Sequence, residues 1–569
     1  MFLRKHVVQR GEHTYISYRL CRTVREAGSV RQELVANLGK LSDKEAERIG
    51  AQLLAIAGKP PKPSDARGAN SEASSIADTI QGPARLYGGP LLVQALIDMA
   101  QLPALLQPLG QTRRRLDLCR TITVALCAQL LAPGSELNTC QWQDKLGFTQ
   151  PPYQIPYHHF LRALDVLADH HDQIEDGLFA RVKHLFNQSV DVVFYDLTSS
   201  YFEGDGPADL AKRGYSRDGR PDCVQVVVGL AVTKDGFPIA YRVHPGNTVD
   251  AKTVQALAAD FRQRFDIDRC LIVGDSGILS RDNAAQLDEL GLGYLLGMRA
   301  ASTQAAKDAI AATRGLEPAG YLGHVGYFTP QVRDGKAYIV LHSPGRQAKT
   351  RAIAERKLAK VRPQLQQLER DVAAGKVRKP ETIVQRATRI LVAAKATPLI
   401  HWELADERFA WRENEPHLAA IRTEGGKYVL QSNVLDLTAP DAAVAYRQLE
   451  AAENCFRHLK DTLRLRPIYH RHPRRVIGHI GLCVMALFLL RLLEDRLMAA
   501  GICTPAEQAF AAAQELLAVP VRLSEPEAAG EGRTIWPSPH LTARAAAIFR
   551  AVGVTDPKAR FEADIAAAP

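Results

Sequence analysis

The sequence lacks the features that mark disulfide-bonded, secreted and membrane-spanning proteins. Its nine cysteines are scattered, and no two of them form a C-x-x-C pair. An odd number of cysteines without metal-ligand spacing argues against a disulfide framework or a zinc site and indicates reduced, intracellular thiols. The N-terminus has no apolar stretch of signal-peptide length. The most apolar run, residues 480–490, has 11 residues, whereas a bilayer needs about 20. We therefore expect a buried core helix, no membrane contact and a cytoplasmic protein.

Fixed-period repeats and low-complexity tracts are also missing, and the composition is that of a folded protein. Hydrophobic residues make up 46% and charged residues 24% of the 569 residues, a length that suggests about three or four units. The net charge is +10 and the pI about 9.1. A polyanion is therefore a plausible partner, although many basic proteins bind nothing acidic.

The first 188 residues divide by pattern into three segments. Residues 1–57 alternate apolar and polar positions before a capped helical stretch, which predicts a small unit of a β-hairpin plus a helix. Residues 58–83 are rich in Pro, Gly, Ser and Ala and predict a linker. Residues 84–188 are helical in pattern. Within them 118–146 is a candidate DNA-binding helix-turn-helix with Ser135 as a helix N-cap. An ordinary helical hairpin is the alternative.

The remaining residues predict an interrupted α/β sheet. In 189–300, three apolar β-rich runs are followed by helix, strand, helix and strand. The first three strands are close enough in sequence to be antiparallel neighbours, and the others need crossovers. Residues 301–425 interrupt this pattern as an insertion, and 426–500 resume it. Residues 501–569 form an Ala-rich helical tail.

Two aspartates follow apolar strands of this sheet. Asp196 lies in DVVFYDLTSS, and Asp275 lies in CLIVGDSG. Aspartate is unfavourable inside strands, so an acid at the end of an apolar strand needs a reason. An Asx-turn or a helix cap is one reason. Two such acids on one sheet can also converge on one cleft with a third from a later helix.

The stretch YRQLEAAENCFRHLK, residues 446–460, supplies candidates for that third acid. At about 100° per residue, an apolar stripe on this helix should face a core. Glu453 lies on the seam between the stripe and a row of basic residues, whereas Glu450 points further toward solvent. Glu453 is therefore the better candidate. The stripe comprises Ala445, Leu449, Ala452, Phe456 and Leu463.

Three carboxylates without His or Cys ligands predict a hard, all-oxygen site suited to Mg²⁺ or Mn²⁺. Two such ions can activate a water or hydroxyl on one side of a phosphodiester and stabilise the leaving oxygen on the other. The neighbouring basic row fits a phosphate backbone. The row comprises Arg457, Lys460, Arg464, Arg466, Arg471, Arg474 and Arg475.

At this point the sequence resembles the DDE transposases of bacterial insertion sequences, in the group with a Y-x2-R-x3-E-x6-K signature. Tyr446, Glu453 and Lys460 stand at the spacing of that signature. YDLTSS resembles the first-aspartate strand, VGDSG the second, and GHIGLCVMALFLLRLLE the apolar helix after the signature. The resemblance covers about 190–300 and 425–495. It departs where the signature has arginine and this chain has Leu449. Arg457 is the candidate substitute.

The resemblance implies an RNase H-like mixed sheet with a β-rich insertion, preceded by a small β/α unit and a helical domain. It implies Asp196, Asp275 and Glu453 as the catalytic metal ligands, with two Mg²⁺ or Mn²⁺ ions. Tyr446, Arg457, Lys460 and Arg464 are the corresponding DNA-binding residues. Such enzymes cut transposon ends by hydrolysis and then join the freed 3′-hydroxyl to target DNA. They act on double-stranded terminal inverted repeats as multimers, here expected to be a homodimer.

Two alternatives share the same residues. One is a catalytically inactive DNA-binding protein that descends from a transposase, although all three carboxylates are present. The other is an RNase H-like nuclease without a strand-transfer step. The Tyr/Glu/Lys spacing and the long insertion favour transposition.

Overall fold

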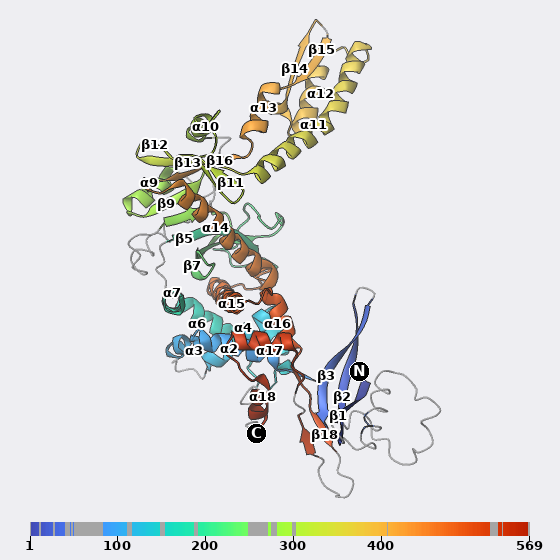
Figure 1. Cartoon of the computed structure of the whole chain (residues 1–569). Helices are drawn as coiled ribbons and strands as arrows, with labels where there is room; N and C mark the ends of the chain where they lie inside the picture. Colours follow the sequence, from blue (N-terminus) through green and yellow to red (C-terminus); the bar gives the residue numbers. More distant parts are fainter. Residues whose placement is uncertain are drawn as a thin grey trace, which may run out of the picture.

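A large mixed sheet organises the computed structural model of the chain (Figure 1). Asp275, the segment 58–83, the helix expected at 250–264 and most of the one expected before residue 57 lie outside the described residues. The structure describes residues 2–10, 13–26, 29–39, 46, 49, 84–110, 116–147, 154–186, 192–248, 271–274, 281–298, 303–406, 408–523, 533–536 and 539–566.

The strands follow the order β10-β11-β13-β16-β9-β8-β5-β6-β7, and β12 pairs with β13. β5, β6 and β7 are antiparallel neighbours, whereas β8 and β9 run parallel to β5. Three antiparallel strands, β5, β6 and β7, followed on the other side of β5 by the parallel strands β8 and β9, form the RNase H-like arrangement, so the predicted mixed sheet is confirmed. The strands of this sheet outside the insertion are β5 (Val192–Tyr201), β6 (Gln225–Thr233), β7 (Pro238–Pro245), β8 (Leu271–Gly274), β9 (Gly293–Gly297) and β16 (Lys427–Ser432).

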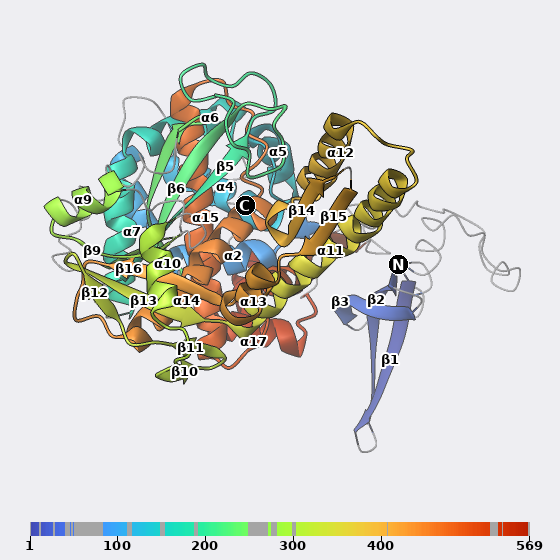
Figure 2. The same ribbon diagram turned by 90° about the horizontal axis from the view of Figure 1, so that it is seen from above.

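The insertion extends this sheet and adds a projecting arm. Its strands β10 (Gly320–Leu322), β11 (Val325–Tyr327), β12 (Gln331–Arg333) and β13 (Lys336–His342) join the sheet through β16. The arm, from α11 to α13, projects away from the sheet (Figures 1 and 2). It comprises α11 (Pro344–Ala373), α12 (Pro380–Ala393), the hairpin β14 (Ile400–Ala405) and β15 (Arg408–Glu413), and α13 (Glu415–Glu424).

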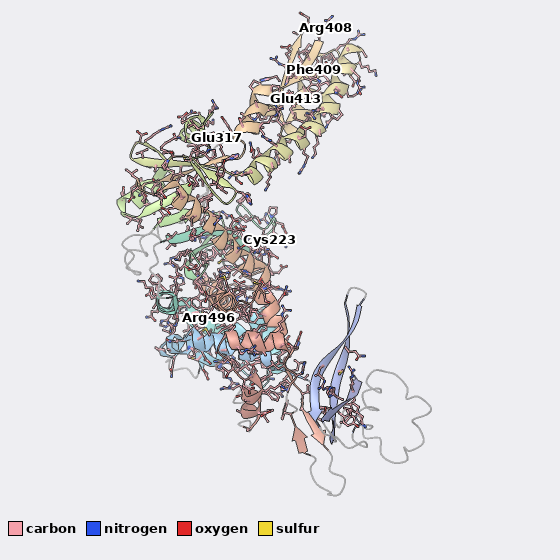
Figure 3. The ribbon with its side chains drawn as sticks, in the orientation of Figure 1. Cys223, Glu317, Arg408, Phe409, Glu413 and Arg496 are labelled. Atoms are coloured by element: carbon pink, nitrogen blue, oxygen red, sulfur yellow. The ribbon has the colours of Figure 1, made fainter. Side chains whose placement is uncertain are left out.

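The arm is more helical than the sequence suggested, because its basic stretch forms the long helix α11. The side chain of Ser343 caps this helix by accepting a hydrogen bond from Arg346 N. The arm has its own core, in which Leu358 and Leu365 of α11 pack with Phe409 of β15. Figure 3 labels Arg408, Phe409 and Glu413 on this hairpin. A separate core explains how the arm stands clear of the sheet.

The helices before the sheet share one hydrophobic core with it. Their contacts converge on α15 (Pro473–Ala499), which lies between the sheet and these helices (Figure 1). The side chain of Ser135 caps α5 as predicted, by accepting a hydrogen bond from Asn138 N. The helices are α2 (Gly88–Met99), α3 (Leu102–Leu106), α4 (Leu118–Leu131), α5 (Glu136–Trp142), α6 (Tyr157–Asp169) and α7 (His171–Phe186).

α15 contains the apolar run at 480–490 and is the buried core helix that the sequence predicted. A helix that is apolar on all sides must be covered by protein or lipid. Among the described residues, one helix, α15, is long and apolar enough to cross a membrane, and two bent helix pairs pass the same test of length and composition. In α15, 89% of the apolar window is buried inside the protein. Protein side chains therefore cover this helix.

The two ends of the chain add small elements. The first residues form a three-stranded antiparallel sheet of β1 (Phe2–Arg10), β2 (His13–Glu26) and β3 (Ser29–Gly39). β17 pairs with β4, which ties the C-terminal segment to the start of the helical region. The other elements here are β4 (Arg85–Leu86), α16 (Ala506–Gln514), β17 (Leu517–Ala518), β18 (Val521–Leu523), β19 (Arg533–Ile535), α17 (Ala543–Ala551) and α18 (Pro557–Ala566).

Candidate active site

Asp196 lies in the middle of β5. The prediction that this residue ends its strand is wrong, because β5 continues to Tyr201 in antiparallel pairing with β6, where Asp196 faces Leu230. The parallel pairing with β8 extends only from Val192 to Phe194 among the described residues. Asp196 therefore lies where β5 has passed the end of its pairing with β8. Its carboxylate is half-buried, and Oδ1 accepts a hydrogen bond of 2.7 Å from Leu197 N.

β8 is the strand that leads to the second candidate acid. Gly274, its last residue, pairs in parallel with Leu296 of β9. Asp275 is the next residue in the chain but lies outside the described part. β5 and β8 are adjacent strands of the sheet.

Helix α14 (Ala439–Arg457) carries the third candidate acid. Thr438 caps it through a hydrogen bond of 3.2 Å from Asp441 N. The predicted apolar stripe is confirmed, because every one of its five residues is buried. Leu449, at the position of the signature's arginine, belongs to this stripe and is 6% exposed. An arginine there would place an unpaired charge against apolar side chains.

Glu450 and Glu453 are both exposed, so exposure does not distinguish them. Position along the helix is more informative. Near the middle of the helix, the Tyr446 ring lies 5.8 Å from that of Tyr428 of β16. Near the end of the helix, Cys455 Sγ lies 3.2 Å from the carbonyl oxygen of Gly236, in the turn between β6 and β7. The helix thus crosses the sheet, and it contacts β5 and β8 on the way. Glu453 lies two residues before Cys455, on the portion of the helix after Leu449.

The helix widens into a π-helical turn, His458–Thr462, just after the two acids. Leu463 N donates to His458 O at 2.8 Å, which closes the wider turn. Such turns are frequent at functional sites. This one contains Lys460, the last residue of the signature spacing.

Lys460 is held by Asp218, an aspartate in the loop between β5 and β6. Lys460 Nζ lies 2.7 Å from Asp218 Oδ1, and Arg466 Nη1 binds the same oxygen. The side chain of Asp218 is 2% exposed and that of Lys460 is 12% exposed. Burial lowers the pKa of Lys460, although the hydrogen bond with Asp218 opposes this shift. Asp218 belongs to the long loop between β5 and β6, on which Figure 3 labels Cys223.

The predicted basic row is partly neutralised within the protein. Lys460 and Arg466 share Asp218. Arg474 and Arg475 bind Asp169 and Asp165 of α6, the second pair at 3.3 Å. The row therefore helps to fasten the core to the helical region, which periodicity alone did not reveal. Its exposed members are Arg457, Arg464, Arg471 and Arg474, of which Arg474 is the one that binds Asp169.

Arg464 lies two residues after the π-turn. Its backbone is left-handed, with φ of 45°, which is uncommon for a residue other than glycine. It lines a cavity of about 290 Å³ together with Arg466 and Tyr469. Two of the predicted DNA-binding residues are therefore close in sequence. Lys460 lies within the π-turn, and Arg464 follows the turn after the buried Leu463.

The chain matches two family models. The Transposase DDE domain matches residues 190–489, which is more than half of the chain. The N-terminal domain of the IS1634 family transposases matches residues 3–62. No curated protein matches the chain.

Solved structures of a transposase are also similar to part of the chain. The Mos1 paired-end complex with the left transposon end is 14% identical, with a TM-score of 0.14, and the match covers 45% of this chain and 78% of that one. The pre-cleavage Mos1 transpososome has the same identity and coverage and a TM-score of 0.13. The Mos1 mariner paired-end complex with Mn is 15% identical, with a TM-score of 0.13 and coverage of 45% and 68%. These TM-scores are too low to support an argument. The fold assignment rests on the strand order, and the family assignment rests on the two family models. The chain belongs to the DDE transposases of bacterial insertion sequences.

Proposed function

We propose that this DNA transposase cuts the ends of its insertion sequence and transfers the freed 3′-hydroxyl to target DNA, with Asp196, Asp275 and Glu453 as its catalytic carboxylates. The observation that carries this proposal is the path of α14 across the sheet. The helix contacts both β5, which holds Asp196, and β8, which runs directly into Asp275. Glu453 is exposed on that helix and is therefore accessible to a substrate.

The residues present fit a divalent ion such as Mg²⁺ or Mn²⁺. Asp196 and Glu453 offer carboxylate oxygens, which are the ligands that these hard cations prefer. Asp196 Oδ1 already accepts a backbone hydrogen bond, which holds the carboxylate in one orientation. When bound, a pair of such ions would activate the attacking oxygen and stabilise the leaving oxygen of a phosphodiester. The protein contributes a rigid strand for one ligand and a packed helix for the other.

We assign the DNA contacts beside the cut to Tyr446, Arg457, Lys460 and Arg464. Arg457 and Arg464 are exposed cations on either side of the π-turn, which suits contact with phosphates. Lys460 has three N–H donors, and Asp218 takes one of them. Asp218 thereby fixes where the Lys460 ammonium lies.

Base recognition requires more than this site, because phosphate contacts carry no sequence information. We propose that the region 1–57 or the helical region 84–188 reads the terminal inverted repeats. The protein would act in the cytoplasm as a homodimer assembled on two ends. The candidate helix-turn-helix has a buried first helix, α4, and a second helix, α5, whose residue Leu137 is 52% exposed.

Matched glutamine and asparagine variants test the assignment of the acids. Asp196→Asn and Glu453→Gln should each lower Mg²⁺-dependent nicking of a terminal repeat by at least about 100-fold, because each removes a metal ligand. Glu450→Gln, three residues earlier on the same helix, should cut normally. Gel-shift affinity should stay unchanged in all three variants. Normal cutting by Glu453→Gln together with loss in Glu450→Gln would overturn the assignment.

Precut ends separate the proposed reaction from the two alternatives. A transposase joins a precut 3′-hydroxyl to a target plasmid, whereas a nuclease cuts intact ends but gives no joined product. A DNA-binding protein without activity gives neither product.

A further inference from the structure

Three buried side chains that the transposition chemistry does not use meet between the helical region and the catalytic core. Glu136 is the first residue of α5, His470 precedes α15, and His479 lies on α15. Glu136 Oε1 lies 3.0 Å from His479 Nδ1, and Glu136 Oε2 lies 3.1 Å from His470 Nε2. The side chains of all three are at most 8% exposed. One ligand-type atom of each lies within 4.8 Å of the others.

The contact of His470 is unusual for a hydrogen bond. Its Nε2 is buried and, among the described residues, has no hydrogen-bond partner of acceptable geometry, although a carboxylate oxygen is 3.1 Å away. A buried polar atom without a well-aligned hydrogen bond is costly and calls for an explanation. The nitrogen and the oxygen are close without pointing at each other. A nitrogen and an oxygen have this arrangement when both point at a metal ion that lies between them.

The spacing of the three groups is close to that around a tetrahedral ion, because one oxygen of Glu136 faces each histidine and one ligand atom of each residue lies within 4.8 Å of the others. Ligand atoms at about 2.0–2.2 Å from a tetrahedral Zn²⁺ lie about 3.2–3.6 Å apart. The two contacts of 3.0 and 3.1 Å are slightly shorter than this edge, so a small outward movement of Glu136 would accommodate an ion. Two imidazoles and one carboxylate are a ligand set that zinc uses with an open fourth position.

We propose that Glu136, His470 and His479 form a binding site for a transition-metal ion of the Zn²⁺ class. The fourth position would face the cavity of about 290 Å³ that these residues line together with Tyr469 and Arg466. Cysteine spacing argued against a zinc site made of thiols. These ligands come instead from Glu136 and from two histidines that follow it by more than 330 residues in the sequence.

Neighbouring groups hold one ligand ring in place. The other ring nitrogen of His479, Nε2, lies 3.9 Å from Cys483 Sγ, one turn later on α15. Gln129 Nε2 lies 3.4 Å from the same sulfur. Outer contacts of this kind fix the orientation of a ligating imidazole.

Such an ion would clamp α5 to the segment that connects the π-turn to α15. That segment includes Arg464 and Arg466, so the ion would also fix the path of the chain beside the proposed DNA contacts. Its three ligands are different residues from the three proposed catalytic carboxylates, and its occupancy does not depend on how DNA is cut.

Metal binding by the full-length chain tests the proposal. The protein is dialysed against EDTA and titrated with Zn²⁺ by calorimetry and with Co²⁺ by visible absorption. With the proposed catalytic carboxylates saturated by Mg²⁺, wild type should bind one equivalent, give the intense bands of tetrahedral Co²⁺ and melt at a higher temperature with Zn²⁺. His470→Asn and Glu136→Gln should lower the Zn²⁺ affinity at least about 100-fold, since losing an outer-shell partner alone costs 10–100-fold.

Two further variants guard against loss of folding. His472→Asn changes an exposed histidine two residues from His470 and should bind like wild type. His470→Cys replaces one zinc ligand with another. It should bind Zn²⁺ and add a sulfur-to-Co²⁺ charge-transfer band, which a structural role for His470 would not produce. No binding by wild type, or equal binding by wild type and the His470→Asn, Glu136→Gln double variant, would overturn the proposal and leave a network of ion pairs.

Discussion

The carboxylate of Asp218 should stabilise the catalytic core more than any exposed acid near the site. It is 2% exposed and accepts from two cations, Lys460 and Arg466, which are 12% and 25% exposed. Breaking a buried ion pair by removing one partner costs about 3–5 kcal/mol, because a charge is left without compensation. Both cations keep some access to water and can be partly rehydrated. We therefore expect Asp218→Ala to cost about 3 kcal/mol, at the low end of that range.

Lys460→Ala should cost less, about 1–2 kcal/mol, because Arg466 still pairs with Asp218. Residues in one ion-pair network couple by about 0.5–3 kcal/mol, so the double variant should cost clearly less than the two single variants together. Urea unfolding followed by circular dichroism measures the three values. The first transition is compared, since a chain of this size does not unfold in one step.

Asp222→Ala is the matched control for this cycle. Asp222 lies in the same loop and binds Arg220, but its side chain is 62% exposed. Its removal should leave the transition unchanged. Additive costs for Asp218→Ala and Lys460→Ala, or equal costs for Asp218→Ala and Asp222→Ala, would refute the view that the buried acid holds the π-turn.

Three other outcomes follow from the structure. Arg457→Ala should lower the salt slope of log K for DNA binding by about 0.9, as expected for one lost phosphate contact, in filter-binding titrations. Burial lowers the pKa of His171, but the hydrogen bond and charge of Glu175 raise it above its ordinary value. The stabilisation by His171 is thus complete below the unfolded pKa and is lost as the pH rises through the folded pKa, so His171→Gln should flatten that part of the melting profile. Gly478→Ala should lower the melting temperature, because its Cβ would overlap the backbone of α6, whereas Gly345→Ala meets nothing closer than 3.9 Å and should not.

The sequence predicted a helix or strand correctly where the pattern of apolar residues within that one element is sufficient to identify it. Unbroken apolar runs identified β5, β6 and β8 because strands buried on both faces need no alternation. The helical period identified the buried stripe of α14, since every third or fourth residue returns to the same face. The run at 480–490 identified the core of α15 because a helix that is apolar on all sides must be covered. Each of these signals lies within a few helical turns or one strand, so it can be recognised without knowing which other elements pack against it.

The departure from the signature at Leu449 also had a local explanation. Position 449 falls on the apolar stripe by periodicity, and the structure buries it. The extent of β5 did not follow from the sequence. Asp196 marked the end of an apolar run, but pairing with β6 carried the strand on to Tyr201. Hydrogen bonds from a neighbouring strand, rather than side-chain pattern, decided where this strand ends.

Only the tertiary structure decided which charged side chains are partners. Lys460 and Asp218 are 242 residues apart, and Glu136 and His479 are 343 residues apart. A loop aspartate and a basic row both look like solvated surface in one dimension, because charge alone does not show what will cover it. Folding buries Asp218 against the π-turn and Glu136 against α15. The sequence determined the elements and the candidate acids. Long-range packing determined which charged side chains are removed from water and paired with each other inside the fold.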